Sequence, residues 1–244
     1  MYDSRVRHVI NMIKRILYIS ILCCGAIFLM TEMGCRKNQL EPKPNDVGYG
    51  YFPLEVGNTW IYQVDSIHYD AFAKSIDTFS FLVKQVVVDT VVDNQGVRSS
   101  IVEFFRTDSL TGAYKLDRTL SKRIVDFRAE VIDSNVRVIN LVFPPTLYKY
   151  WDANAYNTKS KSEYEILEAL DSERIGTVLY NNVVHVVQRD EAFKTLRNYG
   201  VEKYAKGFGM VYAHQIYWIK KTIGDSTEIP NGYDYTYTLK KFDQ

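Results

Sequence analysis

The thiol of Cys35 has the most specific chemical context of any side chain in the sequence. It follows Gly34 at the end of an apolar run, Ile16–Met30, which the basic pair Lys14-Arg15 precedes. The run has fifteen residues, fewer than the roughly 20 that a membrane-spanning helix needs, and it fits the h-region of a secretory signal. A small residue directly before a cysteine in this context is typical of a bacterial lipobox. We therefore expect cleavage before Cys35 and acyl groups on Cys35 that hold the protein to a membrane.

An uncleaved membrane anchor is the alternative for residues 1–35, because Glu32 and Met33 stand where a lipobox usually carries leucine and a small residue. Either Met1 or Met12 could start the chain. If the signal is removed, the other two cysteines of the chain leave with it. The mature chain then keeps no thiol for a disulfide, a zinc site or a nucleophile.

The histidines do not form a recognisable catalytic or metal-binding pattern. His68 and His214 lie far apart in the sequence and show no ligand spacing. His185 lies between Val184 and Val186, which predicts a hydrogen-bonded, partly buried sheet residue; a role as ligand or base is the alternative. The sequence contains no zinc-protease, nucleophile-elbow, Walker or calcium-loop motif. We expect no catalytic residue, no metal and no cofactor.

A second group of candidates combines an aromatic ring with carboxylate and amide side chains. Trp151, Asp152, Asn154 and Asn157 lie in a predicted loop, where they could hold a sugar by stacking and hydrogen bonds. Such residues also hydrogen-bond the backbone of their own loop. Both interpretations stay open, and Trp151, Asp152, Asn154 and His185 are the candidate binding residues.

Composition limits the class of protein and of partner. The chain from Cys35 to Gln244 has 210 residues, enough for a single β-rich domain that buries roughly 70% of its unfolded surface. Removing the leader takes four basic and two acidic side chains from the 30 and 29 of the whole chain and leaves a net charge of −1. Nothing in this balance indicates binding to nucleic acid.

We divide the chain into a signal segment, residues 1–35, a flexible tether, residues 36–50, and one β-rich domain, residues 51–244. The tether is polar and contains Pro42, Pro44, Gly48 and Gly50, and such a stretch cannot bury enough apolar surface to order itself.

Alternating apolar and polar residues predict strands in the first half of the domain. A turn signal at Asp93–Gly96 indicates a hairpin with a four-residue loop. The expected strands are Thr59–Asp65, the segment around Phe79–Val83, Arg98–Arg106, Ala113–Thr119, Arg123–Val131 and Val136–Val142.

The second half shows the same kind of pattern. Asn181-Asn182 predicts a tight turn between two short strands within Val178–Val187, since asparagine tolerates positive φ. Gly207–Gly209 predicts another tight turn. Glu163–Leu170 is interpreted as a strand, and Ile216–Lys221 and Tyr233–Lys240 form a last pair.

The predicted fold is mainly β: an antiparallel curved meander, possibly a partly open β-barrel, with an N-terminal signal helix. Trp60 and Tyr62 are expected in its core, and Phe52 and Leu54 at one end of the core. Trp151, in a loop, is expected to have few neighbours.

Four blocks of the sequence, in chain order, resemble uncharacterised lipoproteins of Bacteroidetes: Phe52–Leu54 with Gly57–Tyr62, Trp151–Asn157, Tyr180–Val186 and Tyr204–Val211. The resemblance implies an exported, lipid-anchored, β-rich domain and brings no activity. The basic, polar start Arg36–Gln39 favours the periplasmic face of the outer membrane.

The expected function is that of a non-catalytic envelope lipoprotein that binds or scaffolds an unknown protein or small-molecule ligand. A carrier of lipid or apolar ligand on an open half-barrel is the alternative, and a periplasmic hydrolase comes third. The expected membrane contact is through the acyl anchor.

Replacing Cys35 by alanine should abolish metabolic acyl labelling, because the lipid-accepting thiol is removed, and leave the chain unprocessed or released from the membrane fraction. Labelling with a fatty-acid analogue, followed by fractionation, measures this. Unchanged labelling of Cys35→Ala would contradict the lipoprotein interpretation.

Overall fold

The computed structural model describes residues 47–108, 111–222 and 227–244 as an antiparallel β fold with one 3-10 turn, Tyr49–Tyr51. The expected signal segment, Cys35 and residues 36–46 of the expected tether lie outside the described residues. Within the described part of the chain, no helix reaches the length and apolarity that a membrane crossing needs.

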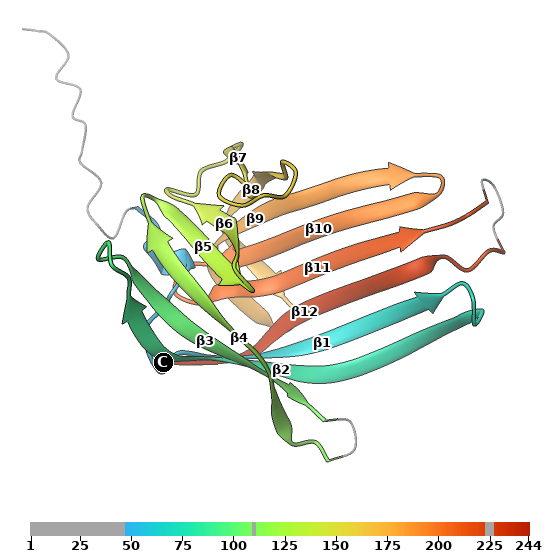
Figure 1. Cartoon of the computed structure of the whole chain (residues 1–244), viewed down its shortest axis with the longest axis horizontal. Helices are drawn as coiled ribbons and strands as arrows, with labels where there is room; N and C mark the ends of the chain where they lie inside the picture. The colour runs from blue at the N-terminus through green and yellow to red at the C-terminus, as the bar shows by residue number, and fades with distance from the viewer. Residues whose placement is uncertain (1–46, 109–110, 223–226) are drawn as a thin grey trace, which may run out of the picture. The chain divides into compact units, whose positions relative to one another are not determined.

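Twelve strands make up the sheet (Figure 1). Their bounds are β1 Thr59–Asp70, β2 Ser75–Val92, β3 Arg98–Thr107, β4 Tyr114–Val125, β5 Arg128–Asp133, β6 Val136–Val142, β7 Tyr150–Asp152, β8 Glu163–Ile175, β9 Val178–Phe193, β10 Leu196–Ala205, β11 Gly209–Ile219 and β12 Asn231–Asp243.

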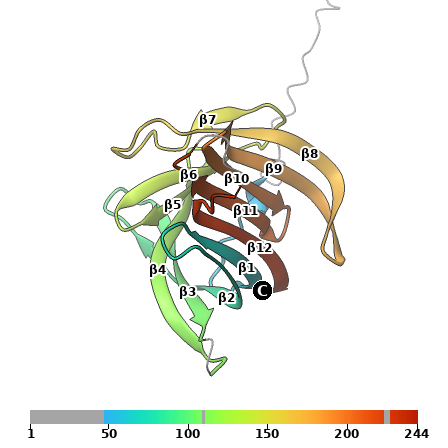
Figure 2. The same cartoon turned by 90° about the vertical axis from the view of Figure 1, so that its right-hand side faces the viewer.

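The strands form one sheet in the order β6-β5-β4-β3-β2-β1-β12-β11-β10-β9-β8-β7. Two meanders are thus joined by the pairing of the first and last strands, β1 with β12. The sheet curls on itself until its edges approach, which gives a nearly closed barrel with one unsealed seam (Figure 2). The predicted curved, partly open β-barrel is confirmed.

Hydrogen bonds bridge the seam near its middle, although β6 and β7 form no ladder. The amide of Ile139 donates to the carbonyl of Ala153 at 2.9 Å, and the indole Nε1 of Trp151 donates to the carbonyl of Ile139 at 2.9 Å. Asn157 Nδ2 donates to the carbonyl of Arg137 at 2.7 Å. These bonds hold the two edges of the sheet together.

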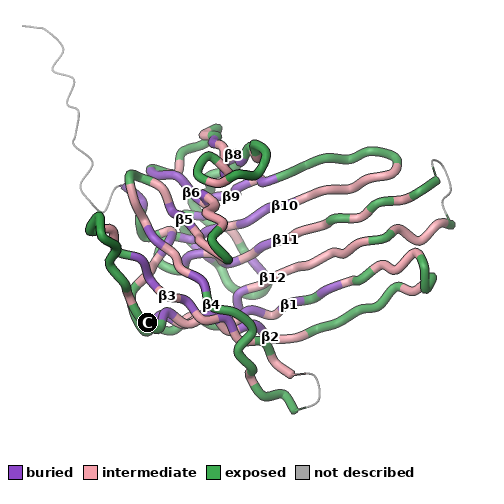
Figure 3. Tube along the Cα trace, viewed as in Figure 1, coloured by how far each residue is buried: buried purple, intermediate pink, exposed green. Residues whose placement is uncertain are grey.

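The fold is closed at one end and open at the other. In Figure 1, β4, β5 and β6 cross in front of one end of the long strands, and the other ends of β9–β12, β1 and β2 extend away from them. Burial follows this division, because the buried segments gather in the closed half (Figure 3). Along β1, Trp60, Tyr62 and Val64 are buried, whereas His68 near the far end is exposed.

The core consists of two clusters of buried side chains. One spans the seam and includes Leu141, Trp151, Ile166 and Val186. The other draws on β1–β4 and β8–β12 and includes Trp60 and Tyr62, as predicted for these two residues. The alternation read from the sequence therefore identified the buried face of β1.

A buried ion cluster joins β4, β5 and β6. The carboxylate of Glu130 is 0% exposed. It accepts from Arg123 Nε at 2.8 Å and from Arg128 Nε at 3.2 Å, and Arg137 Nε lies 3.6 Å from it. Three guanidinium groups thus compensate one carboxylate, as a buried charge requires.

The first half of the sheet departs from prediction at β4. The predicted strands Ala113–Thr119 and Arg123–Val131 are divided elsewhere: β4 runs without a break to Val125, and the chain turns at Asp126-Phe127, where both φ angles are positive. The real turn was missed because phenylalanine is not a typical turn residue. A strand end was predicted within β4 because polar residues such as Lys122 interrupt the apolar pattern of its inward face.

The second half departs from prediction at Asn181-Asn182. These residues lie inside β9, and the hairpin turn is at Gly176-Thr177, between β8 and β9. Asn182 does adopt a positive φ of 52°, and its carbonyl accepts from the amide of Lys206 at 3.1 Å. The left-handed backbone expected of a turn residue is here an irregularity within a strand.

Other boundaries agree closely with the sequence. Val136–Val142 is β6, Glu163–Leu170 lies within β8, and glycines with positive φ flank Phe208 in the turn between β10 and β11. Five residues, Asp93–Val97, rather than four separate β2 from β3.

The folded domain begins before the predicted boundary at residue 51. Val47 is 8% exposed and belongs to the cluster at the seam. Tyr49 packs edge-on against Phe143, with ring centroids 5.0 Å apart. The end of the predicted tether is therefore part of the domain.

The loop predicted for Trp151 is also wrong, since this residue lies in β7 and is 9% exposed. Trp151→Ala should lower the free energy of unfolding by about 3–5 kcal/mol, because a large buried ring and the bond to Ile139 are both lost. Urea denaturation measures this.

Trp218→Ala is the matched control, because Trp218 is only half-buried in the open half of β11. The loss of unfolding free energy in Trp218→Ala should be clearly smaller than in Trp151→Ala. Equal losses for the two variants would mean that the seam contact of Trp151 contributes no special stability.

Candidate functional site

The closed half of the barrel contains a cavity of about 390 Å³, within the range of small-molecule sites. Its walls come from β1–β6 on one side of the fold and β10–β12 on the other. Aromatic rings form much of the surface: Trp60, Tyr62, Phe81, Phe104, Tyr235 and Tyr237.

The segment before β1 closes one end of the cavity. Phe52 and Leu54 line it there, as predicted, and the carbonyl of Leu54 accepts from Ser100 Oγ at 2.8 Å. Trp60 Nε1 donates to the carbonyl of Phe208 at 2.6 Å, and the Tyr62 hydroxyl donates to that of Met210 at 2.9 Å. These bonds fix the ring positions at the closed end.

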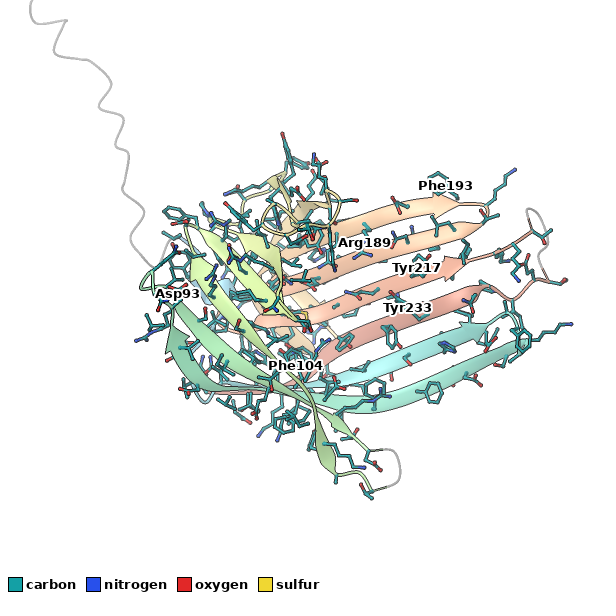
Figure 4. The ribbon with its side chains drawn as sticks, in the orientation of Figure 1. Asp93, Phe104, Arg189, Phe193, Tyr217 and Tyr233 are labelled. Atoms are coloured by element: carbon teal, nitrogen blue, oxygen red, sulfur yellow. The ribbon has the colours of Figure 1, made fainter. Side chains whose placement is uncertain are left out.

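The other end of the cavity opens toward the exposed part of the sheet. Along β2 the residues that share the cavity face become steadily more exposed, from Val87 at 1% through Val83 at 8% to Phe79 at 54%. Tyr217 and Tyr233, labelled in Figure 4, lie on β11 and β12 beyond this opening, and their ring centroids are 5.9 Å apart. The aromatic wall therefore continues from Tyr235 in the cavity lining to an aromatic shelf outside it, formed by Tyr217 and Tyr233.

Lys122 of β4 places an amine among the aromatic rings of the closed end. Its Nζ donates to Gln85 Oε1 at 3.0 Å and lies 5.5 Å from the ring centroid of Phe104 and 5.9 Å from that of Trp60. Burial lowers the pKa of the Lys122 amine to about 8, although the carboxylate of Glu202 acts in the opposite direction.

Glu202 and Tyr204 of β10 supply the polar groups of the opposite wall. Both side chains are buried, and the Tyr204 hydroxyl donates a short hydrogen bond to the Glu202 carboxylate. Burial and the charge of Glu202 raise the pKa of Tyr204 and of Tyr62. Both phenols therefore remain protonated at neutral pH and act as hydrogen-bond donors.

Two arginines lie against aromatic rings of the cavity wall toward its open end. The guanidinium of Arg106 lies 3.7 Å from the ring centroid of Phe81, and that of Arg118 lies 4.9 Å from that of Phe104. Cation–π contacts of this kind hold a charged group against a ring, and Arg118 also lies 3.6 Å from the carboxylate of Asp133.

The loop residues predicted as binding candidates lie away from the cavity lining. Asp152 Oδ1 accepts from the amides of Asn154 and Ser162 at 3.0 and 2.9 Å, and Asn154 Nδ2 donates to the carbonyl of Ser160 at 2.7 Å. Asp152 and Asn154 thus bond their own loop, whereas Trp151 and Asn157 donate to carbonyl groups of β6 across the seam. The geometry corresponds to the loop-capping interpretation.

His185 also lies outside the cavity lining, in a cluster with acidic residues. Its Nε2 lies 2.6 Å from Glu173 and its Nδ1 2.9 Å from Glu168, and Lys203 pairs with Glu173. His214 bonds Asp234 at 2.8 Å. Among residues 47–108, 111–222 and 227–244, no cluster of three His, Cys, Asp or Glu side chains is placed to hold a metal ion.

Sequence reasoning missed Lys122 and Glu202, the charged groups of the closed end. A signal was present, because Lys122 follows the inward Leu120 by two positions, and Glu202 precedes the inward Tyr204 by two. Period-two alternation therefore places both charges on a buried face.

Comparison with known proteins identifies no family for this chain. No family model matches the chain, and no curated protein matches it. A crystal structure described as that of "a putative lipoprotein from Parabacteroides distasonis" aligns with a TM-score of 0.40 and 12% sequence identity, over 79% of this chain and 98% of the other.

The lowered pKa of Lys122 predicts how stability depends on pH. Between pH 8 and pH 10.5 the unfolded chain keeps the Lys122 proton and the folded protein does not, so this residue makes the free energy of unfolding rise with pH there. Lys122→Met lacks this contribution. We expect the variant to be more stable than the wild type at pH 7, by on the order of 1–3 kcal/mol.

The difference in the free energy of unfolding between Lys122→Met and the wild type should become smaller as the pH rises toward 10. Urea denaturation of both proteins between pH 7 and pH 10 measures it. A stability difference that does not change with pH would show that the Lys122 amine titrates as it does in water.

Proposed function

We propose that the protein is a lipid-anchored envelope protein whose β domain binds a small amphipathic molecule in the barrel cavity and performs no chemistry on it. The aromatic cavity of about 390 Å³, open at one end, is the observation that carries the proposal. Enclosed apolar sites of this size with a few convergent polar groups are characteristic of small-molecule binding.

The sequence supports the location. Cys35 is the proposed lipidation site, and the first buried residue of the domain is Val47. The eleven residues between them would span at most about 40 Å if fully extended, so the domain would stay close to the membrane. The basic residues Arg36 and Lys37 support the periplasmic face of the outer membrane.

The polar groups in the cavity favour an amphipathic ligand over a purely apolar one. A ligand without polar atoms would cover Lys122 and Glu202 and give them no partner in place of water, which is costly for buried charges. The carrier of a lipid or apolar ligand is therefore the second candidate, and the open aromatic shelf of Tyr217 and Tyr233 is the feature that supports it.

A hydrolase is the weakest candidate. The described residues that line the cavity include no serine, threonine, cysteine or histidine that could act as a nucleophile or its histidine base. Of the two carboxylates in the lining, Asp117 and Glu202, the second already accepts a hydrogen bond from Tyr204. This composition supports a binding role rather than a catalytic one.

Filling the cavity tests the proposal. The purified wild-type protein should bind about one equivalent of the neutral probe N-phenyl-1-naphthylamine, seen as a saturable rise in fluorescence. Ala213 is buried and lines the cavity, so Ala213→Phe should weaken binding by about tenfold or more by occupying the volume of the ligand. Leu120→Trp, on the facing wall, should do the same.

The control is Ala192→Phe, since Ala192 is an exposed residue of β9 that does not line the cavity. The affinity of Ala192→Phe for the probe should equal that of the wild type. Thermal melts should show that all variants are folded. The proposal would be contradicted if the wild-type protein did not bind the probe, or if Ala213→Phe and Leu120→Trp bound it with the affinity of the wild type.

A further inference from the structure

Resting on the proposed cavity function, we infer that the cavity selects ligands with an anionic group, carboxylate, sulfonate or phosphate, and that the ammonium group of Lys122 receives this group. The body of the ligand then lies against the aromatic walls. The inference depends on the hydrogen bonds of Lys122, its surroundings and the partners of the other charged groups in the cavity.

Lys122 has unused hydrogen-bonding capacity. An ammonium group has three N–H donors, and within the described part of the chain its acceptor is Gln85 Oε1, at 3.0 Å. No carboxylate of the described residues lies within ion-pair distance of it; the ion pairs of β4 involve Lys115, Arg118 and Arg123. Two donors thus remain for a ligand.

The surroundings of Lys122 strengthen any bond that it makes to an anion. Its Nζ lies 5.8 Å from the ring centroid of Phe52, in addition to its contacts with Phe104 and Trp60. Gln85, its hydrogen-bond partner, is itself 5% exposed. Charge attraction is several times stronger in such surroundings than in water.

The other charged groups of the cavity leave the Lys122 ammonium available to an anion. Lys122, Arg106 and Arg118 bring three positive charges to the cavity walls, against two negative charges from Asp117 and Glu202. Glu202 already accepts from Tyr204, and Asn140 of β6 is the neutral polar residue of the seam side. Arg118 also lies 3.6 Å from Asp133, so an ion pair partly neutralises it, whereas the hydrogen bond of Lys122 is to the neutral amide of Gln85.

Other titratable groups that face Lys122 are phenols. They are Tyr62 on β1, Tyr204 on β10, and Tyr235 and Tyr237 on β12. Burial raises the pKa of Tyr62, Tyr204 and Tyr237. Burial lowers the pKa of Lys122 to about 8. We therefore expect Lys122 to be the group near the ligand that loses its charge between pH 7 and pH 9.5.

A matched pair of probes tests the inference. The anionic probe 1-anilinonaphthalene-8-sulfonate has the aromatic body of N-phenyl-1-naphthylamine plus a sulfonate, which stays charged at every pH used. The wild-type protein at pH 7 should bind the anionic probe about tenfold more tightly than the neutral one. Lys122→Met should remove this preference and change the affinity for the neutral probe less than about twofold.

Two further variants give the controls. Lys122→Arg keeps the charge and should retain most of the preference, and Arg118→Gln removes a cation from the wall beside Phe104 and should leave most of it. For the wild type, affinity for the anionic probe should fall as the pH rises from 7 to 9.5, because Lys122 loses its proton. Lys122→Met and Lys122→Arg should not show this fall.

Competition against the bound neutral probe distinguishes the sources of the anion. Decanoate and decyl phosphate represent a fatty carboxylate and a phosphate headgroup, and 1-decanol is the uncharged control. Either anion should displace the probe at lower concentration than 1-decanol, and the more effective one identifies the headgroup class.

The outcomes separate the two proposals. If neither probe binds, the proposed function falls together with the inference. If the neutral probe binds but the anionic one is not preferred, or if the preference survives in Lys122→Met, the anion inference alone is overturned.

Discussion

The contact between the two edges of the sheet decides what this molecule can do. Ile139 of β6 donates its amide to Ala153 and accepts from the indole of Trp151, so one residue joins both sides of the seam. Without this contact the twelve-stranded sheet would be an open, curved surface. With it, the closed half becomes a barrel, and the charges inside it lie among buried aromatic side chains, where charge attraction is stronger than in water.

The barrel wall opposite β10–β12 must remain rigid although it carries many charges. The buried Glu130 does this for β4–β6, because Arg123, Arg128 and Arg137 approach its carboxylate from three strands. These four residues do not line the cavity, whereas Lys122, the neighbour of Arg123 on β4, does. Neighbouring charges on one strand thus have different surroundings: Arg123 joins strands through Glu130, and Lys122 lies in the cavity with Gln85 as its hydrogen-bond acceptor.

Much of the fold could be predicted from the sequence because strand alternation is a local property. The buried face of β1, the exact bounds of β6, the turn around Phe208 and the plug at Phe52 and Leu54 all follow from neighbouring residues. Predictions failed where the same local sequence is compatible with two structures. Asn182 adopts the left-handed backbone expected of a turn, but pairing with β8 and β10 keeps it inside a strand.

The sequence by itself determined the proposed address at Cys35, the β class of the domain and the aromatic character of its core. The tertiary structure alone decided that Trp151 is buried at a seam and that Lys122 and Glu202, 80 positions apart in the sequence, line one cavity. The physical reason is that alternation fixes the face of a strand on which a side chain lies, whereas the curvature and order of twelve strands fix which faces meet. That arrangement is a property of the whole sheet, and no local pattern of residues contains it.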